Sequence, residues 1–200
     1  MNPDVGAGHD AYFRKTLPPV RRAFFGHEPM TCPAAYLERG PEALVVGGYR
    51  RVVDCAIAGD TAEGKQAADA LHRLHREAFG PAESRIILDG LTTFISTLSR
   101  CATCPLRAFP SESHHLCRDE CLILALVSAL QHGDDNAGRL TACALTCPAR
   151  AVETLAASGD YAMRMKMFGQ VLLPVPQNAI AALLTPQPPQ NYHQHNHTIH

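Results

Sequence analysis

A run of nine residues at 122–130, Leu-Ile-Leu-Ala-Leu-Val-Ser-Ala-Leu, constrains the fold more than any other segment. Asp119 and Glu120 precede the run, where the helix dipole favours negative charge, and Gly133 follows it as a natural helix stop. The pattern predicts a helix over 115–132. Because this helix is apolar on nearly every side, other elements must surround it. We therefore expect it to be the central buried helix of the fold.

The segments before this helix also follow a helical period. Apolar residues recur every three or four positions over 45–56, 67–78 and 82–99, which predicts three amphipathic helices. In the second, Asp60 and Glu63 have the spacing of an N-terminal capping box. The first helix is the least secure, because Val-Val-Gly-Gly-Tyr-Arg-Arg-Val-Val is also compatible with a hairpin.

After the central helix, Asp-Asp-Asn at 134–136 predicts a tight turn into a further helix. We expect this helix to meet Pro148, to continue to about residue 157 and to stop at Gly159. Shorter helices are expected over 160–171 and 177–184. The fold class that follows is all-α, a compact bundle of five to six helices.

The composition divides the chain into three parts. Residues 1–30 are expected to form a loosely ordered N-terminal segment, and residues 31–184 a helical domain, consistent with a 46% hydrophobic content. Residues 185–200 are rich in Pro, Gln, Asn and His and have few apolar side chains. This composition predicts a disordered His-rich C-terminal tail.

Charge and hydropathy argue against several kinds of partner. The formal net charge is −1 and the 18 basic residues are scattered, so we expect no nucleic-acid surface. No apolar run approaches the ~20 residues of a membrane-spanning helix. The N-terminus lacks the pattern of a secretory signal, so we expect a cytoplasmic protein whose cysteines are free thiols or metal ligands.

Four cysteines in one short stretch are the strongest chemical signal. Cys101, Cys104, Cys117 and Cys121 have the spacing C-x2-C-x12-C-x3-C. A C-x2-C pair in a turn can direct two thiolates at one ion, and residues four apart on a helix share a face. The stretch therefore predicts a thiolate metal site, with zinc as the first choice and copper(I) or an iron–sulfur cluster as the others.

A helical hairpin about Gly133 would bring further ligands to this site. If the helices on either side of the turn pack antiparallel, Cys147 becomes level with Cys121. Thr-Cys-Pro at 146–148 also places Cys147 near a helix start, because Pro favours the first helical position. The reserve ligands are then Cys147, Cys143 and His115.

Two functions remain open. The first is a cytosolic metal-binding protein with an accessory or metal-handling role. The alternative is a metal-free interaction or regulatory protein whose cysteines are core residues, since free cysteine is among the most buried residue types. In both cases a protein partner is expected, and the oligomeric state stays open.

Enzyme activity is not favoured, because no catalytic motif is present. His72 and His75 lie three positions apart, but Arg73 and Arg76 flank them, so a solvated polar face is expected rather than a metal site.

Overall fold

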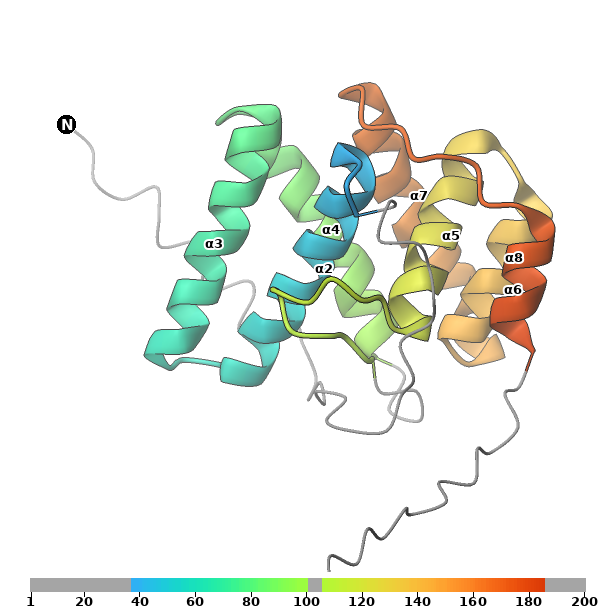
Figure 1. The fold of residues 1–200 in the computed structure, drawn as a ribbon, viewed down its shortest axis with the longest axis horizontal. Helices are drawn as coiled ribbons and strands as arrows, with labels where there is room; N and C mark the ends of the chain where they lie inside the picture. Colours follow the sequence, from blue (N-terminus) through green and yellow to red (C-terminus); the bar gives the residue numbers. More distant parts are fainter. Residues whose placement is uncertain (1–36, 101–105, 186–200) are drawn as a thin grey trace, which may run out of the picture.

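A computed structural model describes residues 37–100 and 106–185, and the regular elements in these ranges are helices (Figure 1). In chain order they are α2 (Gly40–Ala58), α3 (Ala62–Phe79), α4 (Glu83–Ser99), α5 (Arg118–His132), α6 (Asp135–Leu145), the 3-10 turn η2 (Pro148–Arg150), α7 (Ala151–Met167) and α8 (Gln177–Leu184). The all-α class is confirmed. The seven α-helices in these ranges exceed the five to six that the sequence predicts. The expected N-terminal segment, up to residue 36, and the His-rich tail, from residue 186, lie outside the described residues.

The helices are arranged from one end of the molecule to the other in pairs. α3 lies at one end against α2, and α6 and α8 lie together at the other end (Figure 1). Between them, α4 packs along α7, and α5 packs on both α6 and α7. A single large cluster of buried apolar side chains reaches from α2 to α8.

α5 is the buried helix that its sequence predicts. Leu122, Ile123, Leu126 and Val127 are each at most 1% exposed. α5 ends at Gly133, whose φ of 75° is the left-handed conformation that glycine adopts without strain. It begins at Arg118 rather than near residue 115, because the residues before it are held as an ordered loop.

The expected helix through Pro148 is wrong, because the chain breaks there. α6 ends at Leu145, and the backbone of Cys147 is extended, with φ −69° and ψ 149°. A residue before proline is driven out of the helical region by the proline ring, which accounts for the break. α7 then continues past Gly159 to Met167, so Gly159 does not end a helix.

α2 is a helix and not a hairpin, and its glycines allow neighbouring helices to approach closely. A Cβ added at Gly48 would lie 2.9 Å from Leu91 Cδ2 and 3.1 Å from His75 Cε1. The Gly47-Gly48 pair therefore serves helix packing rather than a turn. In α3, the N-terminal cap is Thr61, whose side chain accepts a hydrogen bond from the Gly64 amide at 3.3 Å, and not Asp60.

Candidate functional site

A buried ion pair anchors the loop that precedes α5. Arg50 comes from the middle of α2, and Glu120 from the first turn of α5. Arg50 Nε donates to Glu120 Oε1 at 2.7 Å, and Arg50 Nη2 donates to Oε2 at 3.1 Å. The two side chains are 3% and 0% exposed. This two-point contact fixes the relative orientation of the guanidinium and carboxylate planes.

The same two side chains hold the backbone of residues 106–117, which we call the 106–117 loop. Arg50 also donates to the carbonyl oxygens of Ser113, at 2.6 Å, and His115, at 2.5 Å. Glu120 accepts from the backbone amides of Phe109, at 3.0 Å, and Cys117, at 2.8 Å. The polar atoms of both ions are thus occupied, which a buried pair requires if it is not to be strongly destabilising.

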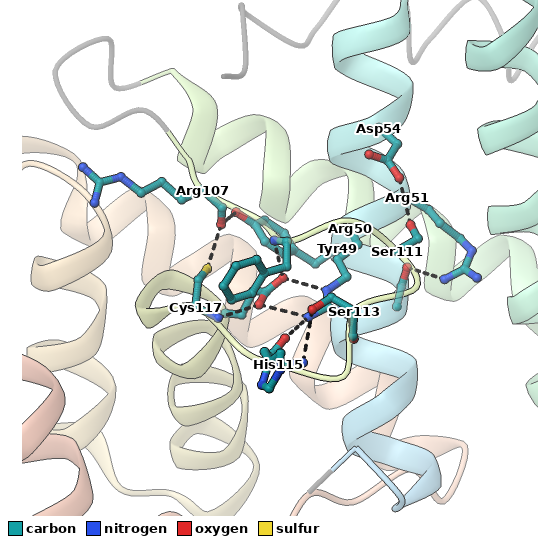
Figure 2. Close-up of polar contacts among 12 residues, drawn as sticks. Tyr49, Arg50, Arg51, Asp54, Arg107, Ser111, Ser113, His115 and Cys117 are labelled. Carbon is teal, nitrogen blue, oxygen red and sulfur yellow. Dashed lines mark hydrogen bonds and ion pairs between the residues drawn. The ribbon is translucent and has the colours of Figure 1, made fainter. Parts of the chain in front are cut away.

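A second set of contacts fixes the start of this loop (Figure 2). The Arg107 carbonyl oxygen accepts from the Tyr49 hydroxyl at 2.8 Å and from the Cys117 thiol at 3.3 Å. The Arg107 amide donates to Asp119 at 3.1 Å. Burial, with the nearby charges of Asp119 and other acidic groups, raises the pKa of Tyr49, so its hydroxyl stays a donor. The loop backbone is therefore held from α2 and α5 together.

The loop has a buried and an exposed side, since Leu106, Ala108 and Leu116 are buried in the core while other side chains face outward. The main-chain carbonyls of Ser113 and His115 face Arg50, while the side chains of Arg107, Glu112, His114 and His115 are exposed. The loop therefore has a polar, charged surface, and the buried Arg50 and Glu120 side chains fix the conformation of its backbone.

Cys117 has a structural role at the start of α5. It is the N-cap residue and is 3% exposed, and its thiol donates to the Arg107 carbonyl. Burial, with Glu120 beside it, raises the pKa of the Cys117 thiol well above its usual range. Cys121 is 5% exposed and lies within the main core. Both cysteines are thus in positions that suit packing, and Cys117 is a neutral thiol in this arrangement.

The remaining predicted ligands lie in different environments. α5 and α6 do pack together as the hairpin hypothesis requires. Cys143 is exposed and Cys147 is partly buried, and the side chain of His115 is exposed. Within residues 37–100 and 106–185, no three or more His, Cys, Asp or Glu side chains gather where they could hold a metal ion. Cys101 and Cys104 lie outside the described residues, so the four-cysteine site stays a prediction.

Sequence reasoning missed Arg50 and gave Glu120 only a dipole role. The signals were available: Arg50 follows Tyr49 within an apolar stripe, and Glu120 stands three residues after Cys117, the spacing of a capping box. Cysteine in place of serine or threonine concealed that pattern. In the structure the Glu120 carboxylate does accept from the N-cap amide.

His75 is a second buried polar side chain, and the expectation of a solvated face is wrong for it. The residue is 0% exposed and its ring stacks on Phe79, with centroids 6.2 Å apart. Nδ1 lies 3.0 Å from the Leu71 carbonyl oxygen, whereas Nε2 has no hydrogen-bond partner within the described chain. Burial lowers the pKa of His75 to about 4, with smaller effects from the charges of His72 and Arg51.

Comparisons of the chain with protein-family models, with curated proteins and with solved structures find no match. None of the helices within the two described ranges has the length and apolar composition needed to cross a bilayer. The function must therefore be inferred from the geometry of the chain itself.

Proposed function

We propose that the chain is a helical interaction protein that binds a protein partner through the 106–117 loop. The observation that carries this proposal is the anchor beneath the loop. Six hydrogen bonds connect Arg50 and Glu120 to each other and to the loop backbone. In this reading Cys117 and Cys121 are structural, as their burial supports.

The energetics of the anchor favour a role in specifying shape. A buried ion pair gains little net stability over well-packed apolar residues, because both charges lose their hydration. We infer that the ion pair serves to fix a conformation, because it selects one backbone path for a segment that lacks regular secondary structure. Fixed loops on rigid scaffolds are common recognition sites. The exposed Arg107, Glu112 and His114 side chains would supply the contacts.

A site-specific photocrosslinker tests this proposal in cells. It is placed at Glu112 on the loop and, as the matched control, at Lys65 on the exposed face of α3. We expect an adduct of defined mass from position 112 and not from position 65. The adduct should weaken when Glu120→Gln loosens the loop, with circular dichroism confirming that the helices remain. No defined adduct at 112, or equal adducts at both positions, would contradict the proposal.

A second candidate function is metal handling through a thiolate site of Cys101, Cys104, Cys117 and Cys121. One contact favours it: the Cys117 thiol donates a hydrogen bond to the carbonyl oxygen of Arg107, and Arg107 is only three residues after Cys104 in the chain. Zinc is the first choice, and copper(I) or an iron–sulfur cluster the alternatives. Binding would require Cys117 to lose its proton and its bond to Arg107.

Element analysis separates the two candidates. The untagged full chain is purified without added metal, and its content of zinc, copper and iron is measured. The metal hypothesis expects about one metal per chain, lost in the Cys101→Ser/Cys104→Ser variant and retained in the control Cys143→Ser. Less than about 0.2 metal per chain would exclude it and leave the metal-free interaction protein.

A further inference from the structure

α3 is attached to the rest of the molecule by few buried side chains. It lies at one end of the molecule and packs on α2 and α4 (Figure 1). Of its 18 residues, Gly64, Leu71 and His75 are buried, whereas α2 buries nine residues and α4 buries twelve. Local unfolding is easiest where buried apolar contacts are few. The attachment of α3 therefore depends strongly on the side chains of Leu71 and His75.

His75 lies where α3 meets both of its neighbouring helices. A Cβ added at Gly48 of α2 would be 3.1 Å from His75 Cε1 and 2.9 Å from Leu91 Cδ2 of α4, so these three residues meet at one point. The imidazole also stacks on Phe79, whose ring packs edge-on against Phe168 with centroids 6.2 Å apart. A change in the charge of this ring would therefore act directly on the contact of α3 with α2 and α4.

One ring nitrogen of His75 has no hydrogen-bond partner. Nδ1 lies 3.0 Å from the Leu71 carbonyl oxygen, so Nδ1 carries the ring proton and donates it, which leaves Nε2 unprotonated. Nε2 is buried without a partner in the described chain and would be 3.4 Å from a Cβ at Gly48. A proton taken up from solvent would therefore bind to Nε2, at the contact between α3 and α2.

Among the described residues, the groups around the imidazole offer no counter-charge for an added proton. The charged groups that act on it are Arg51 on α2 and His72 on α3, while α4 contributes the apolar Leu91. Arg51 donates from Nη1 to the Gly47 carbonyl oxygen at 3.0 Å, and an arginine side chain has no acceptor. A protonated His75 would thus be a buried cation near another cation, which is costly unless the ring reaches water.

We propose that His75 is an acid-sensitive contact that controls the attachment of α3. When Nε2 binds a proton, a state in which α3 has separated from α2 and α4 becomes more populated, because the ring is then hydrated. The other helices stay packed in this state, since α2 also contacts α4 and α5, and α4 contacts α7. Separation uncovers Gly48 and Leu91, which the ring covers at neutral pH. The proposal does not depend on the function of the 106–117 loop or on any metal.

Hydrogen exchange of the full chain, measured by mass spectrometry at pH 7 and pH 5, tests the proposal. Dividing each rate by the intrinsic exchange rate at that pH gives an opening constant for each helix. Burial lowers the pKa of His75 to about 4, whereas an exposed imidazole has a pKa of about 6.5. The opening constant of α3 should therefore rise about twentyfold from pH 7 to pH 5. At pH 5 it should also be at least about tenfold larger than that of α5, which opens only when the core unfolds.

His75→Leu should remove the rise in the α3 opening constant, and the control His72→Gln should keep most of it. An NMR titration of the His75 ring in the wild type follows the protonation itself and stays informative if His75→Leu is unstable. We expect its midpoint below about pH 5. A midpoint near 6.5, an α3 opening constant that does not rise, or a rise that persists in His75→Leu would overturn the proposal. Equal opening constants for α3 and α5 at pH 5 would overturn it too, because α3 would then separate only on global unfolding.

Discussion

At the scale of single residues, His75 makes the stability of the molecule depend on pH. Its imidazole is buried and neutral, with the His72 and Arg51 charges nearby also disfavouring protonation. Its pKa is about 4 in the folded state and about 6.5 in the unfolded state. The unfolded state therefore binds more protons between these values. Stability is fully present above about pH 6.5 and is lost as the pH falls towards 4.

We expect His75 to make the free energy of unfolding about 2 kcal/mol lower at pH 5 than at pH 7. This value follows from its pKa difference between the two states, at about 1.4 kcal/mol per pKa unit. Urea denaturation at the two pH values measures the difference. His75→Leu should reduce the pH dependence, whereas the control His72→Gln should keep most of it. A pH dependence unchanged in His75→Leu would show that another group is responsible.

Arg50 and Glu120 make a second residue-scale prediction. Glu120→Ala leaves the Arg50 guanidinium buried without its counter-charge, so we expect a loss of about 3–5 kcal/mol. Arg50→Met/Glu120→Leu should recover most of that stability but should make the 106–117 loop more susceptible to limited proteolysis. The matched control is the exposed Arg150–Glu153 pair, where Glu153→Ala should cost less than about 1 kcal/mol. Equal losses at the two sites would contradict the buried role of Glu120.

At the scale of helices, substituting alanine for two glycines in helix interiors should change the free energy of unfolding in opposite directions. Gly48→Ala would force a Cβ to within 2.9 Å of Leu91 and 3.1 Å of His75, so we expect a loss of about 1–3 kcal/mol. Gly159→Ala meets open space and should gain about 0.5–1 kcal/mol from helix propensity. Chemical denaturation of both variants measures the change in the free energy of unfolding. A loss at position 159 would mean that the local backbone needs glycine.

The helices that the sequence predicted best are those whose apolar pattern depends only on local spacing. α5 is confirmed because an apolar run, acidic residues before it and Gly133 after it all agree. The boundary at Pro148 was missed because proline is compatible with both a kinked helix and a break, and the surrounding packing decides between them.

The candidate site could not be predicted to the same degree. Its central contact joins residues 70 positions apart, and no local pattern encodes such a pairing. The cysteine spacing gave a metal hypothesis, whereas the burial of Cys117 and Cys121 depends on how α5 packs. The arginines that flank His75 in the sequence led to the prediction that its side chain is exposed. Which side of the helix faces the core depends on packing that the local sequence does not show.

At the scale of the whole molecule, the shared core predicts cooperative unfolding. The main cluster includes side chains from α2 through α8, with no division between the first helices and the last. We therefore expect one transition, with equal calorimetric and van't Hoff enthalpies. Differential scanning calorimetry at pH 7 and low protein concentration checks this. Two resolved transitions would show that α2–α4 and α5–α8 are separate folding units.

The anchor of the 106–117 loop also has a consequence for biosynthesis. Arg50 leaves the ribosome 70 residues before Glu120, which corresponds to about 4–14 seconds of translation at 5–20 residues per second. Throughout that interval Arg50 lacks the Glu120 carboxylate that neutralises it in the folded chain, so the buried contact between α2 and α5 cannot yet form. The conformation of the 106–117 loop that Glu120 holds is therefore completed only after the first turn of α5 has been synthesised.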